Sequence, residues 1–88
     1  MIEREATIVN QEGLHARPAA RIVRLASTFD SEIEISKDGF GVNGKSIMGV
    51  MMLAAECGSS ITIRADGPDA EQAAEAQAAL VADGFGEQ

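Results

Sequence analysis

The chain contains one histidine, His15, in the segment EGLHARPAARIV that runs from Glu12 to Val23. Gly13 can turn the chain just before it, and a helical spacing of apolar residues begins just after it. Pro18 follows three residues later. Proline costs little in the first turn of a helix, where its missing N–H would have no intrahelical partner. The spacing therefore predicts that His15 stands at the N-terminal end of a helix.

The start of such a helix is suited to binding an anion. The N–H groups of Ala16 and Arg17 would have no intrahelical acceptors, and the helix dipole adds about half a positive charge there. With the Arg17 guanidinium, they would stabilise a phosphoryl group on a ring nitrogen of His15. The same surroundings favour a neutral, nucleophilic imidazole. The residues predict an anion or phosphoryl site, whose positive field Arg21 would extend toward an acidic partner.

Other chemistry at this histidine finds less support. A lone histidine is commonly a surface residue or a helix cap. A metal site would need further ligands, and the chain has one cysteine, Cys57, whose surroundings in AAECGSS show no sign of thiolate activation. The sequence has no Walker-type glycine loop and no carboxylate cluster for magnesium. We therefore expect no metal and no cofactor, and a phosphoryl group would have to come from another protein.

Size and composition are those of one small globular domain spanning residues 1–88, with 45% apolar and 24% charged residues. The formal charge of −7 argues against nucleic acid or an anionic membrane as the main partner. The N-terminus lacks the apolar core of a signal peptide, and no apolar run is long enough to span a bilayer. We expect a cytoplasmic monomer or weak oligomer without membrane insertion.

Four segments alternate between apolar and polar residues, which is typical of strands with one solvent-exposed face. These are residues 3–9, 31–37, 40–42 and 60–65. The pair Asp38-Gly39 predicts a tight hairpin turn between the second and third segments, because both residues tolerate positive φ.

Three segments have helical character. In the first, the predicted inner face comprises Ile22, Leu25, Ala26 and Phe29, and a more exposed face carries Arg17, Arg21 and Arg24. The second covers SIMGVMML with Ser46 as its N-cap, and the third runs from near Asp69 to Gly84 and is rich in alanine. The order βαββαβα predicts an α+β open-faced sandwich: one mostly antiparallel four-stranded sheet with three helices on one face.

The run GLHARPA at residues 13–19 closely resembles the active-site signature of HPr, the histidine-containing phosphocarrier family of the bacterial phosphotransferase system. GKSIMGVMMLAA at residues 44–55 and the element order match the family too. The resemblance implies the HPr fold and a carrier rather than a stand-alone enzyme. His15 would take a phosphoryl group through Nδ1 from phosphorylated Enzyme I, charged by phosphoenolpyruvate, and pass it to Enzyme IIA proteins. Arg17 would stabilise the transferred group.

The resemblance also implies two further roles. In some bacteria the serine matching Ser46 is phosphorylated by an ATP-dependent HPr kinase/phosphorylase; a plain helix cap is the alternative. Phosphate there would add about 1.5 to 2 negative charges and oppose an acidic partner. The family docks its partners on the first two helices, which predicts a docking surface of Ala20, Arg21, Arg24, Ile47, Met48, Met51 and Met52, with Val50 and Leu53 left to the core.

Three alternatives remain beside a sugar-transport carrier. One is a nitrogen-related regulatory phosphorelay carrier of the same family, which uses the same histidine chemistry. Another is a ferredoxin-like small-molecule regulatory domain with His15 as a cap or ligand contact. The last is a small regulatory adaptor acting through Ser46. GLHARPA favours a carrier because the last two need no histidine, arginine and proline at these positions, and His15 separates the chain from regulatory paralogues that lack it.

Overall fold

The computed structural model describes residues 1–87. The elements follow in the order β1 (Ile2–Thr7), α1 (Ala16–Ala26), β2 (Glu32–Lys37), β3 (Phe40–Asn43), α2 (Ile47–Met51), β4 (Ser60–Asp66) and α3 (Ala70–Ala82), followed by the short 3₁₀ turn η1 (Gly84–Gly86). This order confirms the predicted βαββαβα arrangement. None of the helices in residues 1–87 combines the length and apolar character that crossing a membrane requires.

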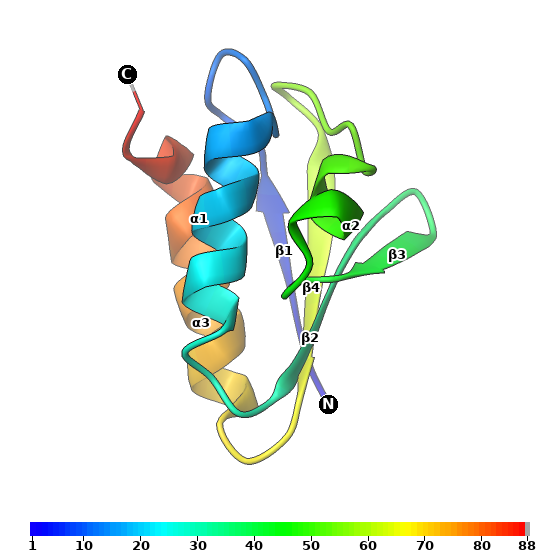
Figure 1. Ribbon diagram of the computed structural model, residues 1–88, viewed down its shortest axis with the longest axis vertical. Helices are drawn as coiled ribbons and strands as arrows, with labels where there is room; N and C mark the ends of the chain where they lie inside the picture. Colours follow the sequence, from blue (N-terminus) through cyan, green and yellow to red (C-terminus); the bar gives the residue numbers. More distant parts are fainter. Residues whose placement is uncertain (88) are drawn as a thin grey trace.

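The strands form one sheet in the order β1-β4-β2-β3, and every pairing within it is antiparallel. The helices cover one face, with α1 and α3 lying side by side along the strands and α2 beside β3 (Figure 1). Strand β1 ends at Thr7, two residues before the predicted end. Ile8 is nevertheless fully buried, and its backbone is still paired: its N–H donates to the Ser59 carbonyl at 2.8 Å and its carbonyl accepts from the Gly58 N–H at 2.7 Å. The predicted open-faced sandwich is confirmed.

The core lies between the sheet and the two long helices. Alternation in β2 and β4 turns one face of each strand inward, and the buried residues there are Ile33, Ile35, Ile61, Ile63 and Ala65. From α1 the buried residues are Pro18, Ala19, Ile22 and Ala26. Leu25 and Phe29, which were predicted to face inward, are only partly buried. The buried residues of α1 therefore lie closer to its N-terminal end than predicted.

Helix α3 begins after Asp69, as predicted, but the Asp69 side chain does not cap its own helix. Its carboxylate accepts from the Ser31 hydroxyl at 2.5 Å and from the N–H groups of Asp30 and Ser31 at 2.9 Å each. These hydrogen bonds lower the pKa of Asp69, and the bond from the Ser31 hydroxyl has the largest effect. They tie the start of β2 to the start of α3. Gly84, with φ of 65°, ends the helix as predicted.

Candidate functional site

The loop that leads into α1 is fixed against the loop after α2. The Leu14 N–H donates to the Ala55 carbonyl at 2.8 Å, and Gly13 has φ of 72°. A Cβ at Gly13 would lie 2.6 Å from the Ala55 oxygen, which is closer than real contacts allow. Glycine is therefore required here by both conformation and space. The sequence places the turn correctly, and the tertiary contact sets the position of the next residue, His15.

His15 occupies the N-cap position of α1 in an extended conformation, as predicted. Its carbonyl accepts from the Ala19 N–H at 3.0 Å, while its side chain makes no capping hydrogen bond. Within residues 1–87 the N–H groups of Ala16 and Arg17 donate to no acceptor. Arg17 is exposed in the same turn. An exposed helix N-terminus, a guanidinium and a half-buried imidazole are thus brought together.

The His15 ring has a neighbour that the sequence analysis missed. Nε2 lies 3.4 Å from Oε2 and 3.5 Å from Oε1 of Glu87. Asn10, which is buried, donates from Nδ2 to Glu87 Oε1 at 3.2 Å and to the Gly13 carbonyl at 2.7 Å. Asn10 and Glu87 stand 77 positions apart, so no local spacing relates them. The one available signal was Phe85, an aromatic residue between two glycines of the tail.

Arg21 and Arg24 have different surroundings. Arg21 is exposed, but its Nη1 donates to the Phe85 carbonyl at 2.6 Å, which holds the C-terminal turn against α1. Arg21 therefore also has a structural role, while its guanidinium keeps its charge, and its contribution to the positive field stays a prediction. Arg24, in the last turn of α1, is exposed. The positive charge nearest the start of the helix is that of Arg17.

Ser46 is the N-cap of α2, as predicted. Its Oγ accepts from the Gly49 N–H at 3.1 Å. The neighbouring residue, Lys45, donates from Nζ to the Phe29 carbonyl at 2.8 Å, which attaches this loop to the end of α1. The Ser46 side chain is half-buried. The observed role of its hydroxyl is therefore to cap its own helix.

Four large apolar side chains of α2 and the residue after it are exposed, and we call them the methionine patch: Ile47 (44%), Met48 (76%), Met51 (42%) and Met52 (66%). Val50 and Leu53 are buried, in agreement with their assignment to the core. Ala20, on α1, is half-buried. Helix α2 has only five residues, so it has room for one buried face and one exposed face. The exposed face is free to contact another protein.

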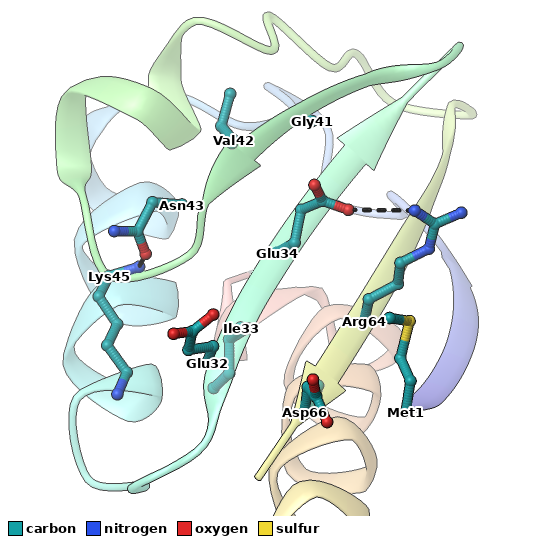
Figure 2. Close-up of a pocket in the computed structure, with 11 residues that line it drawn as sticks. Met1, Glu32, Ile33, Glu34, Gly41, Val42, Asn43, Lys45, Arg64 and Asp66 are labelled. Atoms are coloured by element: carbon teal, nitrogen blue, oxygen red, sulfur yellow. Dashed lines mark hydrogen bonds and ion pairs between the residues drawn. The ribbon is translucent and has the colours of Figure 1, made fainter.

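A separate hollow lies on the open face of the sheet, away from the helices (Figure 2). Both of its cationic side chains are engaged: Lys45 by the Phe29 carbonyl, and Arg64 by Glu34 at 3.3 Å and by Glu3 at 2.5 Å. The hydrogen bond with Glu3 is the first cause of a raised pKa of Arg64. His15 does not line this hollow. The hollow is therefore separate from the histidine and from the start of α1.

Comparison with known proteins agrees with this geometry. Residues 2–83 match the family model described as the PTS HPr component phosphorylation site. The chain is 51% identical to the phosphocarrier protein HPr of Cupriavidus necator over 87 residues, covering 99% of this chain and 98% of that protein. The crystal structure of HPr-C-His from Thermoanaerobacter tengcongensis superposes with a TM-score of 0.95 at 45% identity, covering 100% and 99% of the two chains. The chain belongs to the HPr family of phosphocarrier proteins of the phosphotransferase system.

Two further similarities bear on assembly. An HPr dimer of Thermoanaerobacter tengcongensis matches with a TM-score of 0.78 at 46% identity, covering 99% of this chain and 100% of that one. A domain-swapped dimer of Crh from Bacillus subtilis matches with a TM-score of 0.77 at 42% identity, covering 96% and 97%. Dimers therefore occur among similar proteins, and the expectation of a monomer is not confirmed.

Proposed function

We propose that this protein carries a phosphoryl group on His15, accepting it from phosphorylated Enzyme I and passing it to Enzyme IIA proteins. The observation that carries the proposal is the N-terminus of α1, where His15 is the N-cap, the N–H groups of Ala16 and Arg17 have no acceptors in the described residues, and Arg17 is exposed. A bound phosphoryl group would receive hydrogen bonds and positive charge there without any rearrangement of the backbone. Membership of the HPr family supports the same assignment.

The methionine patch and the exposed arginines of α1 are the proposed docking surface for both partners. Methionine side chains adapt to differently shaped partners because they are flexible and polarisable. The proposal includes a cytoplasmic location, where phosphoenolpyruvate would charge the donor. Both the sugar-transport branch and the nitrogen-related branch of the family fit this chemistry.

Phosphorylation of Ser46 by an HPr kinase/phosphorylase is the proposed regulation. A phosphate on Oγ would stand at the start of α2, next to the exposed Ile47 and Met48. It would add about 1.5 to 2 negative charges beside the docking surface, which would oppose an acidic partner. Lys45 is held by the Phe29 carbonyl, so neutralising this charge would require it to leave that contact.

The deciding experiment is incubation with phosphoenolpyruvate and Enzyme I from either branch, followed by intact mass measurement. We expect one added phosphoryl group that is labile in acid and stable in base, and no addition to His15→Ala. Label that persists in the alanine variant, or that survives acid, would contradict the proposal. Transfer from the labelled protein to Enzyme IIA proteins of each branch then identifies the branch.

A further inference from the structure

The C-terminal turn lies beside the start of α1 (Figure 1), and its anchoring is specific. Phe85 is fully buried, and its carbonyl accepts from Arg21 at 2.6 Å. Two residues further on, the Glu87 side chain is only 18% exposed although it stands near the end of the chain. A carboxylate is thereby held next to His15, at a site whose other features all favour negative ligands.

Asn10 fixes the position of this carboxylate. Asn10, which is 5% exposed, donates from one nitrogen to both the Gly13 carbonyl and Glu87 Oε1. Both partners are acceptors, so the amide nitrogen and not the amide oxygen must stand there. Asn10 therefore links the loop that positions His15 to the carboxylate that faces the His15 ring.

A carboxylate that faces Nε2 determines where the proton of the neutral imidazole resides. An ionised carboxylate only accepts hydrogen bonds, so Nε2 must carry the hydrogen and Nδ1 then keeps its lone pair. We propose that Glu87 is a positioning residue for phosphoryl transfer: it holds the proton on Nε2 and so presents Nδ1 to the incoming phosphoryl group. This inference rests on the proposed function and names the residue that selects the reacting nitrogen.

The charges of the transfer step agree with this role. The Nδ1 lone pair forms the new N–P bond, and the bond between phosphorus and the donor atom of phosphorylated Enzyme I breaks, leaving its electron pair on that donor atom. The Nε2 proton stays in place, so the His15 ring becomes cationic. The Nε2–H···carboxylate contact, 3.4 Å in the free protein, then joins two opposite charges and shortens. Glu87 stabilises the ring charge without occupying the nitrogen that reacts.

The substitution Glu87→Gln tests the inference directly. Asn10 would hold the amide oxygen in the place of Oε1, 3.5 Å from Nε2, and the amide NH₂ group would replace Oε2, 3.4 Å from Nε2. One of the two acceptors beside Nε2 thus becomes a donor, so the preference for a proton on Nε2 should weaken and part of the population should carry it on Nδ1. Long-range ¹H–¹⁵N spectra of unmodified protein at about pH 8, where an ordinary imidazole is neutral, report the tautomer. We expect Nε2–H in the wild type and a mixture of Nε2–H and Nδ1–H in both Glu87→Gln and Glu87→Ala.

Transfer from Enzyme I provides the second measurement. We expect Glu87→Gln to take the phosphoryl group about tenfold more slowly, the factor for one lost charge-assisted hydrogen bond, with an unchanged KM for Enzyme I. Glu87→Asp should recover part of the rate because it keeps the acceptor. The matched control is Glu12→Gln, which removes the same charge from an exposed residue of the loop before His15. It should keep the wild-type spectrum and rate.

Two results would overturn the inference: a wild-type ring with its proton on Nδ1, or identical ring spectra in the wild type and Glu87→Gln. The spectra need no Enzyme I, which separates this test from that of the proposed function. A phosphorylated chain whose ring does not respond overturns the inference alone. A chain whose ring responds but never takes a phosphoryl group overturns the proposed function, and with it the role of Glu87 in transfer.

Discussion

Helices α1 and α2 begin in the same way but use their first residues differently. His15 and Ser46 are both N-caps with extended backbone. The Ser46 hydroxyl accepts from the Gly49 N–H at 3.1 Å, so the side chain of the N-cap residue provides an acceptor for an N–H group of its own helix. The His15 ring makes no such bond and instead faces Glu87, so the first N–H groups of α1 have no acceptor in residues 1–87.

This difference shows what separates a structural helix start from a reactive one. A side chain that caps its helix removes the hydrogen-bonding capacity that an anion would use. A side chain that leaves the N–H groups free and holds a nucleophilic nitrogen beside them preserves that capacity. Helix α3 represents a third case, because the Asp69 carboxylate binds the start of β2 instead of its own helix. The following predictions test these distinctions, from the largest expected effect to the smallest.

Arg17→Ala should cause the largest change if the start of α1 is the reactive one. Its guanidinium acts on the moving group, so the transfer rate should fall about 100-fold, as when one preorganised donor to a developing charge is lost. The KM for Enzyme I should change much less. Stopped-flow transfer measurements with Arg24→Ala as the matched control separate the two effects. Equal defects in both variants would mean that Arg17 only helps docking.

Met48→Ala should act on docking and leave the chemistry alone. Met48 is the most exposed side chain of the methionine patch, at 76%, so its truncation leaves the fold intact. We expect the KM for Enzyme I to rise up to about tenfold, the cost of one good interface contact, with an unchanged rate at saturation. Val50→Ala, which truncates a buried neighbour, should instead lower stability. A rate defect at saturation in Met48→Ala would refute this division.

Ser46→Asp should slow transfer from Enzyme I by a few-fold, because negative charge at the start of α2 opposes an acidic partner. The effect should shrink as salt is raised, since exposed charges are screened over about 10 Å at 0.1 M ionic strength. Ser46→Ala is the control: it loses the bond to Gly49 at a cost of about 1 kcal/mol and adds no charge. Equal transfer rates for the two variants at low salt, with folding confirmed by circular dichroism, would leave Ser46 as a cap only.

Asp69 should show its structural role as a dependence of stability on pH. Its pKa lies below the ordinary value of 3.8 in the folded protein. Its contribution is therefore fully present above that value and is lost as the pH falls through the lowered folded pKa. Urea unfolding at stepwise lower pH should show a shallower acid loss in Asp69→Asn than in the wild type. Glu71→Gln, an exposed change in the first turn of α3, should keep the wild-type slope.

Much of the molecule was predictable from local sequence because its determinants are local. Alternation in β2 and β4 identified the strands, and the residues after Gly13 identified His15 as the N-cap of α1. The same reasoning identified Ser46 as a cap and separated Val50 from the exposed methionines. Each of these inferences depends on residues within about one or two helical turns or strand repeats of one another, a distance over which periodicity is informative.

Only the tertiary structure placed Glu87 against His15 and Asn10 against Glu87, attached Arg21 to Phe85 and directed Asp69 to Ser31. These contacts join residues that lie 38 to 77 positions apart. Side-chain hydrogen bonds across such distances leave no period in the sequence, because the fold brings the two ends together through the packing of α1, α3 and the sheet. The sequence by itself identified His15 as the residue predicted to react, because its determinants are local, and the tertiary structure decided which nitrogen of its ring faces a carboxylate.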